Sequence, residues 1–90
     1  MPYVLVQHEV KDFSAWRDVF DSVNDLRAQQ GEKSAQVFTN ADNPNMITTI
    51  FEWDTFENAE RYFFNTPELK SAMQEAGVLG PPTITMLNGS

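Results

Sequence analysis

The stretch from residue 47 to residue 73 constrains the fold of this 90-residue chain more than any other. It begins with a run rich in Ile, Thr, Phe and Trp, and that composition predicts a β-strand over Met46–Trp53. Asp54 or Thr55 then caps a helix, and Asp54 followed by Glu57 resembles a capping box. The chain therefore passes directly from a strand into a helix.

This helix is predicted to end near Asn65, and a second helix to begin at once. Thr66 suits the N-cap position, Pro67 suits the first helical position, and Glu68 places an acid in the first turn. Gly77 then ends the second helix. The residues predicted to face inward along the two helices are mostly apolar: Phe56, Ala59, Tyr62 or Phe63, Leu69, Ala72, Met73 and Ala76.

The N-terminal third predicts a strand followed by a long helix. Residues 3–10 alternate between two faces, and one of these faces carries Val4, Val6, His8 and Val10. The strand is apolar on both faces at its start, which predicts a place in the middle of a sheet. Asp12 is a good N-cap, and the apolar spacing after it predicts a helix over Phe13–Gln30 that ends at Gly31.

Two weaker strands complete the chain. The polar pattern of Glu32–Ala41 predicts an edge strand. The cluster over residues 42–45 predicts a turn, so this strand and the next form a hairpin. Gly80-Pro81-Pro82 predicts an irregular segment, which leaves Thr83–Leu87 as a short last strand.

The order of strand, helix, strand, strand, helix pair and strand predicts an α+β fold. It is the ferredoxin-like split βαβ sandwich with an antiparallel sheet, in one domain that spans residues 1–90. Right-handed crossovers place all helices on one face of the sheet. The other face carries Tyr3, Leu5, Met46 and Ile50, and we expect a second copy of the chain to cover it in a homodimer.

The composition argues against several classes of function. The chain has 13 acidic and 6 basic residues and a net charge of −7, so neither nucleic acid nor an anionic membrane is an expected partner. The lack of cysteine removes disulfides, thiol nucleophiles and cysteine metal sites. No long apolar run and no leader-like N-terminus are present, so we expect a cytoplasmic protein.

His8 is the only histidine and the strongest candidate for a catalytic residue. Its face is expected to point at the helices, where an imidazole can exchange a proton near neutral pH. The alternative is a half-buried imidazole hydrogen-bonded to a backbone carbonyl or a water. We expect no metal site, because one histidine with scattered carboxylates lacks the spacing of metal ligands.

Large aromatic residues are expected to line the same space as His8. They would form a flat apolar pocket for a small aromatic ligand, and their alternative role is plain core. Strand alternation alone leaves open which face of the sheet Trp53 occupies. The candidate ligand-binding residues are Trp16, Phe20, Phe51, Trp53, Tyr62 and Phe63.

Four motifs carry a resemblance to a known family: Val10-x-Asp12-Phe13-x-x-Trp16-x-x-x-Phe20, Phe51-Glu52-Trp53, Thr66-Pro67-Glu68-Leu69-x-x-x-Met73 and Ala76-Gly77-Val78. On these residues the chain resembles the dimeric α/β-barrel superfamily, in particular its antibiotic-biosynthesis-monooxygenase-like domains. The resemblance implies a homodimer and one of the activities of the superfamily, which include cofactor-independent oxygenation, heme degradation and polyketide cyclisation. Heme-degrading relatives carry a heme-ligating histidine where this chain has Met73, and a thioether is a poor sole ligand, so we expect no cofactor.

Two hypotheses for the function follow. The first is a small cofactor-independent monooxygenase-like or cyclase-like enzyme that acts on an apolar aromatic or polyketide-type molecule, with His8 moving a proton. The second is a non-catalytic homodimeric domain that binds a small ligand or serves assembly. An open cavity reached by His8 favours the enzyme. A solid core with His8 hydrogen-bonded to the backbone favours the second hypothesis.

Overall fold

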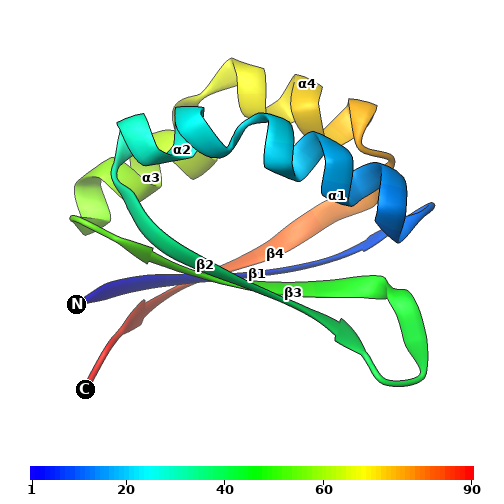
Figure 1. Cartoon of the computed structure of the whole chain (residues 1–90). Coiled ribbons are helices and arrows are strands. Elements are labelled where there is room, and N and C mark those ends of the chain that lie inside the picture. Colours follow the sequence, from blue (N-terminus) through cyan, green and yellow to red (C-terminus); the bar gives the residue numbers. More distant parts are fainter.

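A computed structural model describes residues 1–90 of the protein. Four helices lie together on one face of a four-stranded antiparallel sheet whose strand order is β2-β3-β1-β4 (Figure 1). This arrangement confirms the predicted α+β, ferredoxin-like fold with its helices on one side. The elements are β1 (Pro2–Val10), α1 (Phe13–Ser22), α2 (Asn24–Gln30), β2 (Glu32–Asn40), β3 (Asn43–Trp53), α3 (Phe56–Asn65), α4 (Pro67–Glu75) and β4 (Val78–Asn88).

The core lies between the helices and the two central strands. Side chains alternate between the faces of a strand, so every second residue of β1 and β3 points at the helices. On β1 these residues include Val4, which is 0% exposed, and Val6, which is 2% exposed. On β3, Trp53 is 0% exposed and packs against Tyr62 of α3. Trp53 therefore lies on the helix-covered face, which strand alternation in the sequence had left open.

The long helix predicted over Phe13–Gln30 is wrong, because the helix breaks at Val23. The backbone of Val23 has φ −106° and ψ 16°, and its N–H donates to Asp21 rather than continuing the helix. Two carbonyls that a continuous helix would pair internally are taken by side chains instead. The Ser22 hydroxyl donates to the carbonyl of Val19 at 2.6 Å. The second carbonyl is that of Phe20, which accepts from the side chain of Arg27 in α2.

The start of α3 also differs from the predicted capping box. The N-cap is Thr55, whose hydroxyl oxygen accepts from the backbone N–H of Asn58 at 3.1 Å. Asp54 stands outside the helix, where one carboxylate oxygen accepts from the N–H of Thr55 at 2.6 Å. Glu57 pairs with Arg61 one turn later, at 3.6 Å, instead of reaching back to the cap.

The junction between α3 and α4 is weakly held. Pro67 opens α4 as predicted, but Thr66 makes no side-chain cap, because its hydroxyl donates to the carbonyl of Arg61 at 3.2 Å. No residue of α4 is fully buried. Local stability follows buried apolar contact, so α4 is the helix most easily displaced from the sheet.

The hairpin between β2 and β3 is tighter than predicted. Asn40 already faces Asn43 across the ladder, so the turn contains only Ala41 and Asp42. The predicted turn over residues 42–45 is wrong for its last part, because β3 begins at Asn43 rather than at Met46. Neither turn residue has a positive φ, so this is not one of the usual primed hairpin turns, and the register shifts between Thr39 and Asn40 instead. The predicted edge position of β2 is confirmed.

The last strand is longer than predicted, because Gly80-Pro81-Pro82 lies inside it. β4 begins at Val78 rather than at Thr83. Proline is tolerated there because β4 is an edge strand, where a missing N–H costs no partner strand. A bulge takes up the extra residues: Gln7 faces Thr83, whereas Glu9 faces Leu79.

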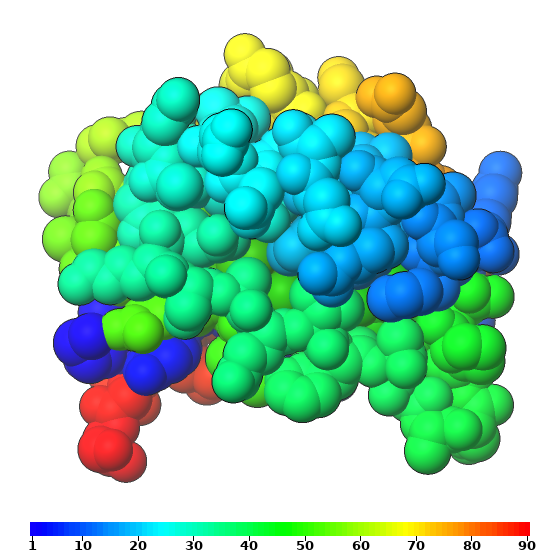
Figure 2. Space-filling model, in the orientation of Figure 1, coloured from blue at the N-terminus to red at the C-terminus, as the bar shows by residue number.

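The second face of the sheet is uncovered. Tyr3, Leu5 and Ile50 on this face are only partly buried, and Phe38 is 50% exposed. The two termini lie side by side at one corner of the sheet, where the N–H of Gly89 donates to the carbonyl oxygen of residue 1 (Figures 1 and 2). None of the helices has both the length and the apolar character that crossing a membrane requires.

Candidate functional site

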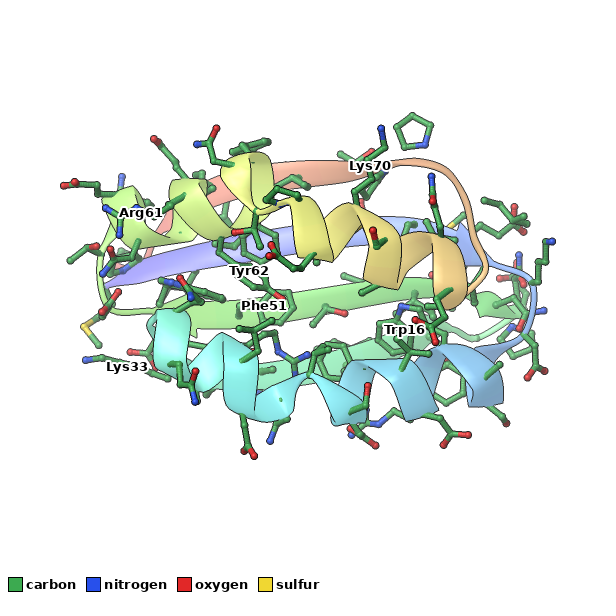
Figure 3. All side chains as sticks on the ribbon, turned by 90° about the horizontal axis from the view of Figure 1, so that it is seen from above. Trp16, Lys33, Phe51, Arg61, Tyr62 and Lys70 are labelled. Atoms are coloured by element: carbon green, nitrogen blue, oxygen red, sulfur yellow. The ribbon has the colours of Figure 1, made fainter.

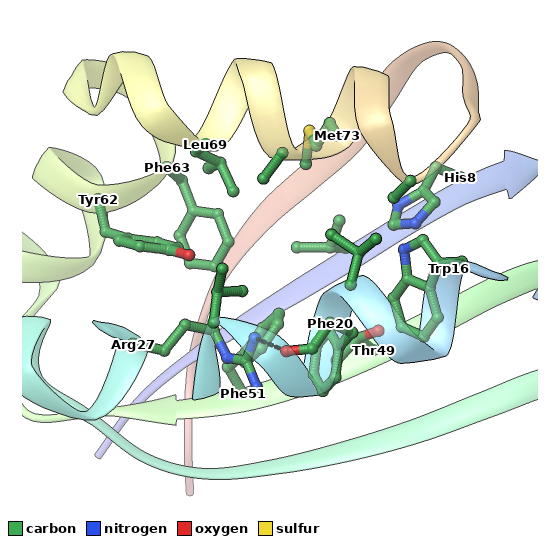
Figure 4. Close-up of a pocket in the computed structure, with 15 residues that line it drawn as sticks. His8, Trp16, Phe20, Arg27, Thr49, Phe51, Tyr62, Phe63, Leu69 and Met73 are labelled. Atoms are coloured by element: carbon green, nitrogen blue, oxygen red, sulfur yellow. Dashed lines mark hydrogen bonds between the residues drawn. The ribbon is translucent and has the colours of Figure 1, made fainter. Parts of the chain in front are cut away.

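A cavity of about 60 Å³ lies between the sheet and the helices (Figure 4). Seen from above, the labelled side chains of Trp16, Phe51 and Tyr62 lie in the gap between the α1–α2 pair and the α3–α4 pair (Figure 3). The walls are mostly apolar and come from β1, β3 and all four helices. The lining side chains are Val6, His8, Trp16, Val19, Phe20, Val23, Arg27, Thr49, Phe51, Tyr62, Phe63, Leu69, Ala72, Met73 and Ala76.

The structure brings together all but one of the predicted site residues. His8 and five of the six aromatic candidates line the cavity. Trp53 does not: it lies behind the wall, and its indole N–H donates to the carbonyl oxygen of Gln30 at 3.0 Å. That hydrogen bond ties the end of β3 to the end of α2. Trp53 is therefore a core residue that supports Tyr62 and Phe63, with ring centroids 5.3 Å from each.

His8 forms part of the cavity wall without any hydrogen-bonding partner in the protein. It is 7% exposed, and both of its ring nitrogens are buried and unpaired. Its ring lies 5.7 Å from the ring of Trp16. Burial lowers the pKa of His8 below its usual value of 6.5, because an apolar surrounding disfavours the charged imidazolium. At neutral pH the imidazole is therefore uncharged and able to accept a proton. The backbone hydrogen bond of the alternative interpretation is not formed.

Thr49 is a second unpaired polar group in the same wall. It is 1% exposed, and its hydroxyl has no partner. Sequence reasoning missed it as a site residue. The available signal was a threonine at an inward-facing position of β3, flanked on that face by Ile47 and Phe51.

The aromatic side chains form a continuous run along the cavity. Trp16 stacks on Phe20 with centroids 4.8 Å apart, and Phe20 contacts Phe51 at 6.1 Å. Phe51 then meets Phe63 at 5.4 Å, and Phe63 meets Tyr62 edge-on at 5.0 Å. These separations are typical of favourable aromatic pairs. The run gives the cavity flat, apolar walls.

Arg27 lines the other end of the cavity, and each of its three guanidinium nitrogens has a hydrogen-bonding partner. It is 2% exposed, and its Nε donates to Glu32 at 2.6 Å. Its Nη1 donates to the carbonyl oxygen of Phe20 at 2.8 Å and its Nη2 to Asn24 at 2.9 Å (Figure 4 shows the bond to Phe20). The hydrogen bond to Phe20 gives a donor to the second carbonyl that the helix break at Val23 leaves without a backbone partner. The guanidinium also lies 3.7 Å from the ring centroid of Phe20.

Tyr62 lies close to this buried ion pair. Burial raises the pKa of the Tyr62 phenol above its usual value of 10.0, Arg27 opposes the rise and Glu32 adds to it. The phenol is therefore protonated at neutral pH. Its hydroxyl group is therefore a neutral polar group at the same end of the cavity as Arg27.

A larger outer groove of about 530 Å³ adjoins the cavity. It runs from the α3–α4 junction to β4, and it shares three lining residues with the cavity: Phe63, Leu69 and Met73. These three side chains form the partition between the two spaces. Two of them belong to α4, the helix without a fully buried residue. The structure contains no group of three or more side chains that could hold a metal ion.

Several solved structures share this fold. No protein-family model matches the sequence, and no curated protein matches it either. A Bordetella bronchiseptica protein described as an antibiotic biosynthesis monooxygenase superposes with a TM-score of 0.82 and 12% identity, over 99% of this chain and 96% of that one. SnoaB, a cofactor-independent oxygenase from Streptomyces nogalater, superposes with a TM-score of 0.78 and 14% identity, over 99% and 92% of the two chains.

A third similar structure contains a bound ligand. The monooxygenase from the gene ActVA-Orf6 of Streptomyces coelicolor, solved in complex with nanaomycin D, superposes with a TM-score of 0.67 and 13% identity, over 99% of this chain and 87% of that one. At these identities the similarity establishes the fold of the antibiotic-biosynthesis-monooxygenase-like proteins and confirms the predicted resemblance at that level.

Proposed function

We propose that this protein is a small monooxygenase-like enzyme that oxidises a phenolic aromatic molecule without a bound cofactor. The observation that carries the proposal is the buried, unpaired and uncharged imidazole of His8 in the wall of an apolar cavity. A phenol placed against this imidazole would donate a hydrogen bond to one of the two unpaired ring nitrogens and could then transfer its proton to that nitrogen. The fold shared with SnoaB, described as a cofactor-independent oxygenase, supports the same chemistry.

In the proposed reaction, the imidazole takes the proton of the phenol and becomes imidazolium. The phenolate then gives one electron to dioxygen, and the resulting phenoxyl radical and superoxide combine to form a carbon–oxygen bond. The imidazolium returns its proton to the peroxide oxygen. Loss of water, which removes the hydrogen of the attacked carbon, leaves a quinone. Phenol and dioxygen thus give quinone and water, with dioxygen as the only oxidant.

The rest of the cavity protects this chemistry from water. The aromatic run from Trp16 to Tyr62 encloses the ligand, and a dry cavity strengthens the interaction between imidazolium and phenolate. A cavity of about 60 Å³ is smaller than an apolar protein cavity that binds benzene, which has a volume of about 150 Å³. The ring therefore enters when Leu69 and Met73 turn aside and join the cavity to the outer groove. Methionine suits this role because its side chain is flexible.

The proposal includes a homodimer formed through the open sheet face. Tyr3, Leu5 and Ile50 are partly buried there without a covering layer, and Phe38 is half exposed. A self-complementary apolar face of this kind favours a two-fold contact. Sedimentation velocity would show a single species of twice the chain mass, and a monomer at micromolar concentration would contradict this part of the proposal.

The second candidate is a non-catalytic homodimeric domain that binds a small ligand or serves assembly. The observation that favours it is the small volume of the cavity, about 60 Å³. Such a domain would bind its ligand without consuming oxygen. It would also tolerate the loss of His8 as a base.

Oxygen uptake with a panel of phenols, hydroquinones and naphthols separates the two candidates. The wild-type protein is compared with His8→Gln, which keeps polarity but removes the base, and with Gln7→Ala, which changes the neighbouring exposed residue on the other face. The expected result is a loss of turnover of about 100-fold or more for His8→Gln and no change for Gln7→Ala. Ligand binding without oxygen uptake by the wild-type protein would overturn the enzyme proposal in favour of the binding domain.

A further inference from the structure

All buried side-chain polar atoms that lack a hydrogen-bonding partner belong to two residues, His8 and Thr49. These atoms are Nδ1 and Nε2 of His8 and Oγ1 of Thr49. Unpaired buried polar groups destabilise a folded protein, so most proteins avoid them. Here they are not scattered: both side chains line the same cavity. Unpaired polar atoms that gather in the wall of one cavity indicate a ligand that would form hydrogen bonds with them.

The sheet register places the two side chains next to each other. His8 faces Ile47 across the β1–β3 ladder, and Val6 faces Thr49. His8 and Thr49 are therefore diagonal neighbours on the helix-covered face, with their Cα atoms about 7–8 Å apart. Side chains at neighbouring positions of one sheet face can both reach one edge of a flat ligand.

Arg27, the charged side chain of the cavity wall, is held by partners within the protein. Each of the three nitrogens of Arg27 already donates to a protein oxygen. The remaining walls beside His8 and Thr49 are apolar, among them Trp16 and Phe20. Polar recognition in this part of the cavity is thus limited to two side chains.

We infer that His8 and Thr49 form a two-point anchor for phenols that carry a second oxygen on the neighbouring ring carbon. The first hydroxyl donates to the imidazole of His8, and the second oxygen pairs with the hydroxyl of Thr49. The inference rests on the proposed function and deepens it. It makes Thr49 a specificity-determining residue that selects vicinal oxygen pairs over simple phenols.

The test compares the binding of catechol and of phenol, measured by calorimetry without oxygen so that no turnover occurs. The wild-type protein is expected to bind catechol about ten-fold more tightly than phenol, which corresponds to one additional buried hydrogen bond. Thr49→Val is expected to abolish this preference and to leave phenol binding unchanged. Thr49→Ser keeps the hydroxyl and is expected to keep the preference.

A second readout separates this role from a structural one. Because the Thr49 hydroxyl is buried and unpaired in the free protein, its removal is expected to raise the midpoint of thermal unfolding, by about 4 °C. The matched control is Thr48→Val on the same strand. The Thr48 hydroxyl lies on the opposite face and accepts from Gln7 at 3.2 Å, so its loss is expected to leave catechol binding unchanged.

Three results would overturn the inference: equal affinity of the wild-type protein for catechol and phenol, an unchanged preference in Thr49→Val, or a lowered unfolding temperature in that variant. If Thr49→Val does not fold, Thr49→Ala reports the same loss of the hydroxyl. Failure of the proposed function is seen separately. Selective catechol binding without any oxygen uptake would refute the oxygenase and keep the anchor, whereas oxygen uptake that depends on His8 without catechol preference would do the reverse.

Discussion

The two ends of the cavity treat buried polar groups in opposite ways. At one end, Arg27 has a protein partner for each nitrogen and a buried carboxylate from Glu32 at 2.6 Å. At the other end, His8 and Thr49 have no partner at all. A group whose partners are all internal holds the fold together, whereas a group without partners is available to a ligand. The contrast separates structural from functional polarity within one small core.

The largest effect is expected from breaking the paired end. Glu32→Ala leaves the Arg27 guanidinium buried without its carboxylate, and we expect a loss of about 3–5 kcal/mol in the free energy of unfolding. Urea unfolding followed by tryptophan fluorescence measures it. Lys33→Ala, at the exposed neighbouring position, is the control and should change stability by less than about 0.5 kcal/mol. A loss below about 1 kcal/mol for Glu32→Ala would show that the paired end does not hold the fold.

The unpaired end is expected to respond with the opposite sign. His8→Leu replaces two unpaired nitrogens with an apolar side chain of similar size, so we expect a gain of about 1–2 kcal/mol in the free energy of unfolding. The same urea titration measures it. Destabilisation by this variant would mean that the imidazole is satisfied in the free protein, and the two ends of the cavity would then no longer differ.

The pH dependence of stability gives a smaller effect with a definite direction. The pKa of His8 in the folded protein lies below 6.5, so the unfolded chain binds more protons than the folded protein as the pH falls below that value. Stability is therefore lost on acidification from pH 6.5 down to the pKa of the folded protein. The other ionisable side chains that line the cavity are Arg27 and Tyr62, and the raised pKa of the Tyr62 phenol keeps it protonated throughout this range.

His8→Leu supplies the reference for this measurement, because the variant shares every ionisable side chain of the wild-type protein except His8. The unfolding temperature of the wild-type protein is expected to fall more between pH 7.5 and 5.5 than that of the variant. Equal slopes would contradict a lowered pKa for His8.

The smallest effect on stability is expected at the partition between cavity and groove. Met73 is partly buried on α4, so Met73→Ala should cost about 1 kcal/mol or less, below the usual range for a fully buried methionine. The same change opens the unpaired end of the cavity to the groove, and we expect a bicyclic phenol such as 2-naphthol to bind more tightly. Gln74→Ala, on the exposed side of the helix, is the control for both readouts. Weaker binding of 2-naphthol by Met73→Ala would show that Met73 contacts the ligand rather than separating the two spaces.

Local patterns in the sequence were sufficient for most of the fold. Alternation along residues 3–10 placed His8 on the helix-covered face, and helical spacing brought Trp16 and Phe20 to the same core. These patterns depend only on the periods of strands and helices. They could not locate the break at Val23, because it is stabilised by a hydrogen bond from Arg27, a side chain of the following helix.

The features that failed to appear in the sequence depend on the whole fold. Gly80-Pro81-Pro82 fits inside a strand only because β4 lies at the sheet edge, a property set by strand order. His8 and Thr49 are unpaired because no surrounding element places a hydrogen-bond donor or acceptor within reach of them, and this depends on how all the elements pack. Trp53 resembled the cavity aromatics in type and spacing, yet its hydrogen bond to Gln30 assigns it to the core.

The bulge in β4 also determines which changes of chain length the protein can tolerate. It lies opposite His8 and sets the phase of the residues that follow, so that Ile84 and Met86 face Val6 and Val4 on the covered side. Deletion of one of the two prolines would shift this phase by one residue and turn Ile84 and Met86 to the opposite face of the sheet, away from the core. The sequence of this segment is typical of a loop whose length can vary. In the structure its length determines which residues of β4 face the core, so we expect homologues with the same core to keep that length.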